Sequence, residues 1–432
     1  MNITDIAKNA NTSALVLAHL STDLKNQALG LMADALEENC DAILSANEKD
    51  LEFAKKEGIA QPLIARLALN EEKVSGMAKG IRSVVALEDP VGKVKSTMEM
   101  DQDLVVKQVT CPIGVIGAIF ESRPDAVPQI SSLCLKSGNA VILKGGTEAQ
   151  NSNKVIVNLL VEAISKVPGL PTSAVQMIET RSEVADMLKE DKYIHLVVPR
   201  GSNAFVKYIQ ENTRIPVLGH SEGVCHGYID KLADLDKSIR ICLDSKLQYP
   251  AACNAMETLL VHKDIAEKVL PDLVGIFKEK QVELVGCVKT CQVVPEVTLA
   301  HESDWDMEYN DLKLSIKIVD SFSEAVKFIN RHGSGHTDVI ITENLERAEQ
   351  FLNEVSSSSV MWNASTRFAD GFRYGLGAEI GISTNRTHAR GPVGLEGLII
   401  YKYKLYGNGH VAGDYSGAKA REFTHKPLTP SM

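Results

Sequence analysis

The N-terminal part of the chain carries apolar residues at the spacing of a helix face. The clearest run follows Ser21 and Thr22, and its apolar positions are Leu24, Ala28, Leu31, Ala35 and Leu36. Intervals of three and four residues place these side chains on one side of an α-helix, and Ser or Thr often precedes a helix start. The pattern predicts a helical N-terminal part.

From about Cys111 the pattern changes to short apolar runs separated by amphipathic segments. Each run is closed by Gly, Pro or a polar residue, and the runs are CPIGVIGAIF, AVILKGG, AVQMIE, IHLVVPRG and IPVLG. Helical spacing returns between them, notably over 151–164 and 202–212. Short buried strands that alternate with helices are typical of βαβ units, so we expect a parallel sheet.

A second series of the same kind begins with METLLVH, which predicts a strand. A helix face then follows at intervals of four, through Ile265, Val269, Leu273 and Phe277. Pro271 lies inside this stripe and is expected to kink or split the helix, because proline removes a backbone hydrogen bond.

Ser321 and Glu324 form a capping-box pattern that opens a further helix, expected to end before Gly333. TDVIIT then predicts another strand. Two βαβ series in succession favour an α/β fold with two domains facing one another. The late stretch LIIYKYKLYGNGH is strand-like and apolar, which suits edge pairing with another subunit.

Composition narrows the functional classes. The chain has 432 residues, 44% of them hydrophobic, and a net charge of −10 from 46 basic and 56 acidic residues. These fractions are globular, and the acidic balance argues against nucleic acid as a partner while allowing a small anionic substrate. No run resembles a membrane span, and MNITDIAKNANTS has neither a basic start nor an apolar stretch, so we expect a cytoplasmic protein. Its eight cysteines are expected to be free thiols.

Cys253 is the first candidate for chemistry. It stands in QYPAACNAMETLLVH, after a proline and two small residues and before Asn254 and a predicted strand. Small neighbours leave the sulfur accessible, and loop amides can hold negative charge on an attacked carbonyl. An isolated cysteine is more often a small buried apolar residue, and Cys225 competes for the same role.

Two turns after predicted strands suit a phosphate or a ribose. Pro199, Arg200 and Gly201 close one strand, and Ser202 can cap the following helix, whose free N–H groups would face an anion. Lys144 closes another strand beside Gly145. Neither segment is a GxGxxG motif, so ordinary βα turns and a solvated lysine remain alternatives.

Metal binding is a weaker reading of GHSEGVCHGYID. This segment brings His220, Glu222, Cys225 and His226 close in sequence, and Cys287 with Cys291 lies further on, but neither spacing matches a zinc pattern. We therefore expect no metal.

A donor-rich segment lies near the C-terminus and contains Asn363, Arg367, Arg373, Arg386 and Arg390. Arginine forks suit a carboxylate or a phosphate. The alternative for each arginine is that it braces domains or subunits.

The longer motifs carry a family resemblance. QYPAACNAMETLLVH, ESRPDAVPQISSLCLKSGNAVILKGG, HSEGVCH, RHGSGHTD and NASTRFADGFRYGLGAEIGISTNRTHARGPVGLEGL resemble gamma-glutamyl phosphate reductase, in the aldehyde dehydrogenase superfamily, from about Ile113 to His410. The resemblance implies an aldehyde-dehydrogenase-like fold and NADPH-dependent reduction of L-glutamyl 5-phosphate through a thioester on Cys253. The product is L-glutamate 5-semialdehyde, on the route to proline. It makes Cys253 the favoured nucleophile.

The same resemblance implies roles for further residues. Arg123, in ESRPDA, stands where relatives have an oxyanion-binding Asn, so Arg123, Asn254 and the Cys253 amide share that assignment. HSEGVCH replaces the motif that carries the hydrolytic Glu of oxidising relatives, so Glu222 is at most a substrate ligand. The implied cofactor residues are Lys144, Gly145, Thr147, Pro199, Gly201, Ser202 and, by a loose match, Glu308. Asn363 and Arg367 are substrate candidates.

Thr147 takes the place of an acidic residue in NAD-preferring relatives. Its neutral side chain favours NADPH, although Glu148 could blunt the preference.

The expected organisation has three parts. Residues 1–227 form an NADPH-binding domain with an oligomerisation hairpin near 94–111, residues 228–360 form the catalytic domain, and residues 361–432 return to the first domain and end in an oligomerisation strand. We expect a homo-oligomer whose substrate comes from a separate glutamate 5-kinase. An oxidising aldehyde dehydrogenase for another semialdehyde and a non-catalytic binding protein are the alternatives.

Overall fold

The N-terminal helices form one side of the first lobe. The computed structural model describes residues 2–201, 203–220 and 222–429. Its first helices are α1 (Ile3–Leu17), α2 (Thr22–Glu38), α3 (Cys40–Lys56), α4 (Gln61–Leu67) and α5 (Glu71–Ala86). The Ser21 side chain caps α2 by accepting a hydrogen bond from the Leu24 amide, 3.4 Å away, as the sequence pattern predicts.

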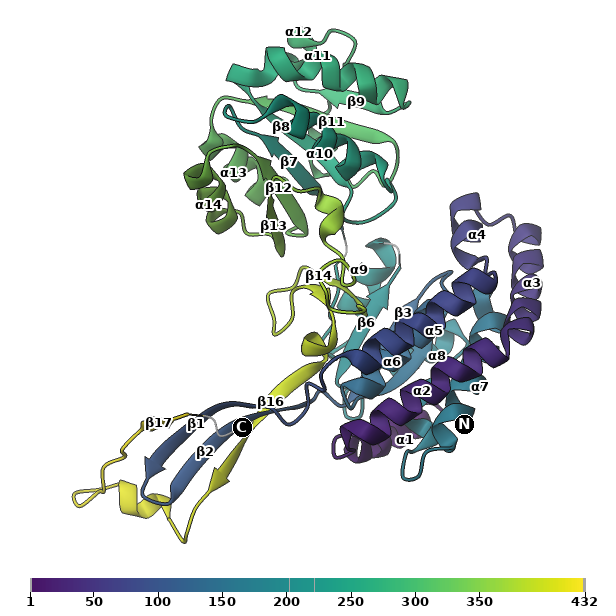
Figure 1. The fold of residues 1–432 in the computed structure, drawn as a ribbon, viewed down its shortest axis with the longest axis vertical. Helices are drawn as coiled ribbons and strands as arrows, with labels where there is room; N and C mark the ends of the chain where they lie inside the picture. The colour runs from purple at the N-terminus through teal and green to yellow at the C-terminus, as the bar shows by residue number, and fades with distance from the viewer. Residues whose placement is uncertain (1, 202, 221, 430–432) are drawn as a thin grey trace.

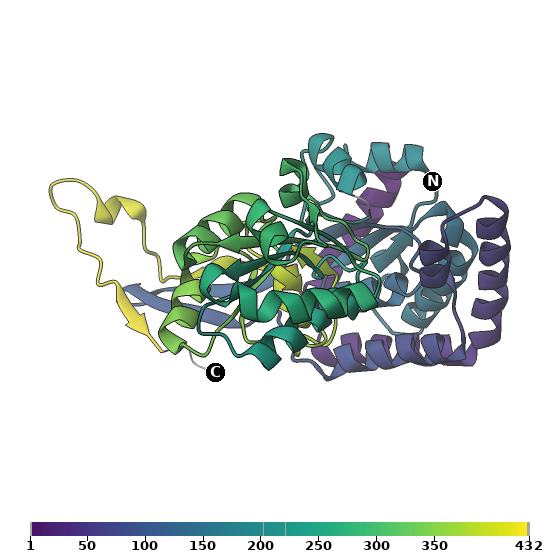
Figure 2. The same ribbon diagram turned by 90° about the horizontal axis from the view of Figure 1, so that it is seen from above.

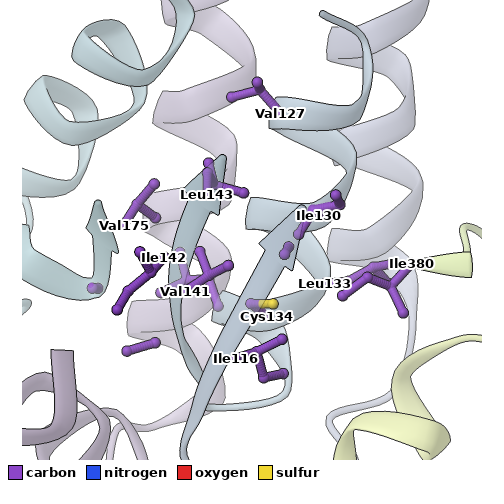
Figure 3. Packing of buried hydrophobic residues seen from close by; sticks show 14 of the residues in the cluster. Ile116, Val127, Ile130, Leu133, Cys134, Val141, Ile142, Leu143, Val175 and Ile380 are labelled. Carbon is purple, nitrogen blue, oxygen red and sulfur yellow. The ribbon is translucent and has the colours of Figure 1, made fainter. Parts of the chain in front are cut away.

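A four-stranded parallel sheet forms the centre of this first lobe. Its strands are β3 (Val115–Phe120), β4 (Ala140–Lys144), β5 (Val175–Met177) and β6 (Leu196–Arg200), in the order β5-β4-β3-β6. The helices between them are α6 (Ala126–Lys136), α7 (Gln150–Ser165), α8 (Arg181–Met187) and, after β6, α9 (Asn203–Glu211). Figure 3 shows Ile116, Val141 and Ile142 of the sheet packed near Ile130 and Leu133 of α6.

The second lobe is built on a seven-stranded sheet in the order β10-β9-β11-β8-β7-β12-β13. The strands are β7 (Cys225–Ile229), β8 (Met256–His262), β9 (Glu283–Gly286), β10 (Thr298–Leu299), β11 (Lys313–Val319), β12 (Thr337–Ile341) and β13 (Ser359–Trp362), all paired in parallel. The helices are α10 (Leu235–Leu247), α11 (Lys263–Glu279), α12 (Val288–Val293), α13 (Phe322–His332) and α14 (Leu345–Glu354). The sheet thus runs from Cys225 to Trp362, and the expected boundaries at 228 and 360 fall inside β7 and β13.

A four-stranded antiparallel sheet forms an arm that projects from the two lobes (Figures 1 and 2). Its order is β16-β2-β1-β17, from β1 (Val94–Asp101), β2 (Leu104–Pro112), β16 (Ile399–Tyr406) and β17 (Lys426–Leu428). The hairpin near 94–111 and the last long strand therefore share one sheet, although some 290 residues separate them.

The remaining segments return to the first lobe. Strands β14 (Gly381–Ser383) and β15 (Gly391–Val393) pair with each other, and Ile380, Val393 and Leu398 belong to the core of the first lobe. Short 3₁₀ helices are η1 (Thr147–Ala149), η2 (Thr172–Ala174), η3 (Glu302–Asp306), η4 (Thr366–Phe368), η5 (Leu395–Leu398) and η6 (Ala412–Tyr415). Among the described residues, no helix is both long and apolar enough to span a bilayer.

Two local expectations are wrong, and a third, that Pro271 kinks or splits its helix, is wrong as to the split. IPVLG is not a strand but makes one bridge, from Val217 to Val197, because it lies at the sheet edge beside β6. CPIGVIGAIF is divided between β2 and β3, with Gly114 at a positive φ of 128° between them. Pro271 does not split α11, which continues to Glu279. Both Pro271 and Glu267, whose carbonyl loses its partner, are exposed, so water can replace the lost bond.

Candidate active site

Cys253 lies in a turn between the end of α10 and the start of β8. The turn is half-buried, so the thiol is reachable without being fully solvated. The Cys253 sulfur and one ring nitrogen each from His220 and His336 all lie within 4.8 Å of one another. The sequence had suggested His220 only as a metal ligand, and it assigned His336 no role. No local spacing could have found this group, because three separate segments contribute to it.

Each of these histidines is oriented by a contact at its Nδ1 atom. His220 Nδ1 lies 2.8 Å from the Ile382 carbonyl oxygen. His336 immediately precedes β12, is fully buried, and places Nδ1 2.8 Å from the Thr337 hydroxyl. The two rings meet edge to face, with centroids 4.9 Å apart. The Nε2 atom of His336 is buried and has no hydrogen-bond partner within the described part of the chain.

The other candidate nucleophile, Cys225, is a poor one. It is fully buried on β7, next to β8, and its sulfur donates to the Cys253 carbonyl oxygen at 3.3 Å. Burial raises the pKa of the Cys225 thiol well above its usual value, and nearby Asp338 adds to the rise. A thiol that stays protonated is a weak nucleophile. Cys253 is thus the better candidate.

The motif that contains Glu222 and His226 does not converge on a metal site. His226 points to the opposite side of β7 from Cys225, with Nδ1 3.0 Å from Asp338 Oδ1, because side chains alternate along a strand. Glu222 is exposed on the surface. Cys287 and Cys291 bond locally, to the Thr290 hydroxyl at 3.3 Å and to the Gly286 carbonyl at 3.6 Å. All eight cysteines are free thiols, as expected.

Arg200 and Arg367 lie within electrostatic reach of Cys253, and Arg123 lies within reach of Arg200. Arg200 ends β6 beside the end of β3, and Arg123 follows β3. Burial lowers the pKa of Arg200 to about 10, helped by repulsion from Arg123 and opposed by Glu379 and Cys253. Burial also lowers the pKa of Arg367, and Cys253 again opposes the change. Arg200 is the residue that the sequence placed in a turn without assigning a role.

The donors of Arg123 and Asn254 already have partners. Arg123 forms an ion pair with Asp125 at 3.0 Å, and the Asn254 side-chain amide donates to the Ala369 carbonyl at 2.9 Å. Asn254 Oδ1 is buried without a partner among the described residues.

The cofactor candidates gather at the carboxyl edge of the first sheet. Gly145 and Thr147 follow β4, and Gly201 follows β6, while Ser202 lies outside the described residues. The chain places β4 on one side of β3 and β6 on the other, which makes this edge a topological switch point, where α/β sheets bind nucleotides. A Cβ atom on Gly145 would lie 2.0 Å from Asn153 Nδ2, so this close turn requires glycine.

Charged groups at that edge are arranged for a phosphate-bearing ligand. Lys144 is 7% exposed, and burial lowers its pKa. The Arg181 guanidinium, at the start of α8, is exposed and adds to this lowering. The Glu148 carboxylate accepts from the Ser122 amide at 2.6 Å and the Ser122 hydroxyl at 2.7 Å, and it opposes the lowering of the Lys144 pKa. Thr147 is exposed beside them. These groups fit a phosphate-bearing nucleotide.

Glu308 connects the two lobes close to Cys253, and Gly223 packs against both Glu308 and the Cys253 backbone. Glu308 accepts from the Asn203 side-chain amide at 2.9 Å, and Asn203 opens α9 of the first lobe. A Cβ atom on Gly223 would lie 2.2 Å from the Cys253 carbonyl oxygen and 2.7 Å from Glu308 Oε1. The Glu308 carboxylate therefore lies beside the Cys253 backbone, and its role as a ligand of the nicotinamide ribose stays a prediction.

Arg66 is a second residue that the sequence did not suggest. From α4 of the first lobe it donates to the Tyr249 hydroxyl at 3.2 Å and to the Ala251 carbonyl at 3.3 Å. Arg367 donates to the Gln248 side chain at 2.8 Å and lies over the Tyr249 ring. The segment just before Cys253 is thus held by Arg66 of the first lobe and by Arg367.

Asn363 does not join this group. Its side chain accepts from the Thr342 amide at 3.0 Å and donates to the Thr342 carbonyl at 3.0 Å, after the carboxyl ends of β12 and β13. Cys253 precedes β8 at the opposite, amino end of the same parallel sheet. The expectation that Asn363 holds substrate beside Cys253 is therefore wrong. Its amide anchors a loop.

Comparisons with known proteins show the family and the fold. Residues 1–301 match the model of the aldehyde dehydrogenase family. The chain is 53% identical to the gamma-glutamyl phosphate reductase of Acetivibrio thermocellus, over 99% of each chain. The crystal structure of the gamma-glutamyl phosphate reductase of Thermotoga maritima superposes with a TM-score of 0.92 at 42% identity, covering 95% of this chain and 100% of that one. An acetylating aldehyde dehydrogenase from Geobacillus thermoglucosidasius, 16% identical over 95% of this chain and 97% of its own with a TM-score of 0.66, shares the fold.

Proposed function

The chain belongs to the aldehyde dehydrogenase family and, within it, to the gamma-glutamyl phosphate reductases, and from this premise we propose that it reduces L-glutamyl 5-phosphate to L-glutamate 5-semialdehyde with NADPH. The observation that carries the proposal is the half-buried Cys253 thiol, which lies between two histidines and within electrostatic reach of two arginines, Arg200 and Arg367. A sulfur nucleophile beside fixed cations suits an anionic acyl phosphate.

The first half of the reaction forms a thioester. A ring nitrogen of His220 or His336 accepts the Cys253 proton, and the thiolate attacks the acyl carbon. The acyl C–O bond breaks, and phosphate leaves with the proton that the histidine returns. Arg200 and Arg367 balance the charge of the substrate phosphate and carboxylate. Atoms and charge balance without a metal ion.

The second half releases the aldehyde. NADPH supplies a hydride to the thioester carbon when it is bound. Collapse of the resulting hemithioacetal restores the Cys253 thiolate and frees the semialdehyde. Exposed Glu222 is a poor candidate for a water-activating base, which agrees with a reaction in which hydrolysis of the thioester would be wasteful. We assign it no catalytic role.

The residues that would hold NADPH lie at the carboxyl edge of the first sheet. Lys144 and Arg181 supply positive charge for the ribose 2′-phosphate, and Thr147 adds no opposing charge. Gly145, Pro199 and Gly201 let the backbone approach the cofactor, and Glu308 would bind the nicotinamide ribose from the second lobe. Glu148 accepts two hydrogen bonds from Ser122, and its carboxylate still acts on Lys144, so it would weaken the preference for a phosphate.

The product places the enzyme at the second step of proline biosynthesis from glutamate. The semialdehyde cyclises to pyrroline-5-carboxylate, and the acyl phosphate comes from a separate glutamate 5-kinase. We place the protein in the cytoplasm, as a homo-oligomer assembled through its arm.

The test runs the reaction backwards, because the acyl phosphate is too unstable to handle. Protein, pyrroline-5-carboxylate and NADP are mixed with and without phosphate, and nicotinamide absorbance is followed. We expect phosphate-dependent reduction of NADP that Cys253→Ala abolishes and Cys291→Ala, a half-buried thiol on α12, leaves unchanged. Reduction without phosphate would instead identify an oxidising aldehyde dehydrogenase. No turnover by a folded, NADP-binding protein would identify a binding protein.

A further inference from the structure

We propose that the active-site group His220, Cys253 and His336 is also a binding site for a single zinc ion, which switches the nucleophile off. The ligands are the Cys253 thiolate and one nitrogen from each imidazole. The fourth position is left for water or another small ligand. The zinc here is a reversible inhibitor, separate from any resident cofactor.

The geometry of the three side chains suits zinc. Their donor atoms all lie within 4.8 Å of one another. Around a tetrahedral zinc, sulfur and nitrogen ligands lie about 3.3–3.6 Å apart, as follows from Zn–S and Zn–N bonds of about 2.3 and 2.1 Å. A closure of at most about 1.2–1.5 Å brings the group to that spacing, which side-chain rotation can supply.

The contacts around the two rings involve Nδ1 and leave Nε2 of each ring without a hydrogen bond among the described residues. His220 Nδ1 donates to the Ile382 carbonyl, so its Nε2 lone pair is free for a metal. His336 Nδ1 lies against the Thr337 hydroxyl, and its Nε2 is buried without a partner within the described residues. Metal-bound histidines almost always have such a partner on the second nitrogen. A ligand at His336 Nε2 would also satisfy a buried polar atom that is otherwise costly.

The surrounding charge selects the class of cation. Arg200 and Arg367 lie within electrostatic reach of Cys253 and repel cations. Hard cations such as Mg²⁺ bind through oxygen and charge, so these arginines exclude them. Zinc forms strong bonds to thiolate and imidazole and is favoured despite the repulsion.

Zinc binding would block catalysis directly. The ion displaces the Cys253 proton into solvent and forms a Zn–S bond with the lone pair that otherwise attacks the acyl carbon. It also occupies the two histidines. A chelator removes the ion and restores the free thiol, so the inhibition is reversible.

The experiment measures the metal at Cys253 rather than turnover. Chelator-treated protein is titrated with zinc sulfate by calorimetry, and iodoacetamide labelling of Cys253 is followed by peptide mass spectrometry. We expect one high-affinity zinc per chain and at least about tenfold slower labelling of Cys253 with zinc, reversed by EDTA. His220→Gln and His336→Gln should each weaken this zinc binding about 100-fold. His332→Gln, which removes a histidine paired with Asp306, is the matched control.

Two results would overturn the proposal. Cys253 could be labelled at the same rate with and without zinc in the native protein, a measurement that needs no variant. Alternatively, both histidine variants could keep the native zinc affinity. Because neither readout uses the reductase reaction, failure of the zinc site is distinguishable from failure of the proposed function.

Discussion

At the scale of single residues, the proposed cofactor site depends on the positions of a few charged side chains. Glu148 stands next to Thr147 in the sequence, yet its carboxylate is held by the Ser122 amide and hydroxyl. Arg181 is exposed and within electrostatic reach of Lys144. Lys144 and Arg181 therefore bring positive charge, and Glu148 negative charge, to the place proposed for the ribose 2′-phosphate.

This arrangement predicts that Arg181 contributes to a preference for NADPH over NADH. Arg181→Ala should lower kcat/KM with NADPH about 10- to 100-fold, the value of one or two lost charge-assisted hydrogen bonds, and leave NADH use nearly unchanged. Steady-state kinetics with both cofactors measure the ratio. Lys189→Ala, which removes an exposed lysine paired with Asp186 just beyond α8, should change neither. An equal loss with both cofactors would contradict a contact to the 2′-phosphate.

At the scale of secondary-structure elements, a buried ion pair clamps the turn that carries Cys253. Lys246 near the end of α10 and Glu257 on β8 are both fully buried, with Nζ and Oε2 2.6 Å apart. Glu257 also accepts from the Asn310 amide at 3.1 Å. Burial raises the pKa of Glu257 to about 7 against the opposing effect of Lys246, and burial lowers the pKa of Lys246.

Removing either partner should destabilise the protein, with opposite dependence on pH. Glu257→Gln leaves a buried cation and should cost about 3–5 kcal/mol at pH 7. In this variant burial keeps the pKa of Lys246 below its usual value. Between the folded and unfolded pKa values the unfolded chain binds more protons, so the stability of the variant rises with pH. Lys246→Met leaves a carboxyl with a raised pKa, so this variant should lose stability as pH rises above about 4.5 and through the folded pKa.

Urea unfolding at pH 6, 7 and 9 measures both slopes relative to the native protein. Lys237→Met, which breaks the exposed pair with Glu343, is the control and should cost less than about 1 kcal/mol at every pH. Parallel slopes in the two core variants would show that the pair is not charged in the folded protein.

At the scale of the whole molecule, the arm leaves an unusual edge. Strand β16 pairs with β2 on one side only, and seven of its eight residues are exposed. Among them are Tyr401, Tyr403 and Leu405, with 53, 66 and 64% of their surface exposed. Proteins seldom leave a long apolar edge strand uncovered, because it pairs readily with another chain. This supports the proposed homo-oligomer.

Negative charges introduced at the exposed apolar residues of β16 should separate the subunits. The double variant Tyr403→Asp with Leu405→Asp should weaken association at least about 100-fold, since each buried unpaired carboxylate costs several kcal/mol. Analytical ultracentrifugation over a range of concentrations measures the mass. Lys402→Glu, on the opposite face of the same strand, is the matched control. An unchanged mass in the double variant would place the interface elsewhere.

The local elements and the family were accessible from the sequence. Helix caps such as Ser21 and Ser321, and strands such as METLLVH and TDVIIT, depend on residues within one or two turns of each other, and the structure confirms them. The sequence failed at IPVLG and at Pro271, where the position at a sheet edge and the exposure of a helix face decided the outcome. Neither property can be predicted from the residues that lie close by in the sequence.

The sequence by itself determined the α/β fold class, the reductase family and the choice of Cys253 as the favoured nucleophile. These depend on motifs and periodicity, which are local and can be read along the chain without a three-dimensional structure. Only the tertiary structure decided that His220 and His336 meet Cys253, that Cys225 is buried beneath it, and that Asn363 lies at the far end of its sheet. These relations follow from the parallel pairing of β7 with both β8 and β12, and β12 lies more than a hundred residues beyond β7. Long-range strand order, rather than spacing along the chain, sets which side chains share a site.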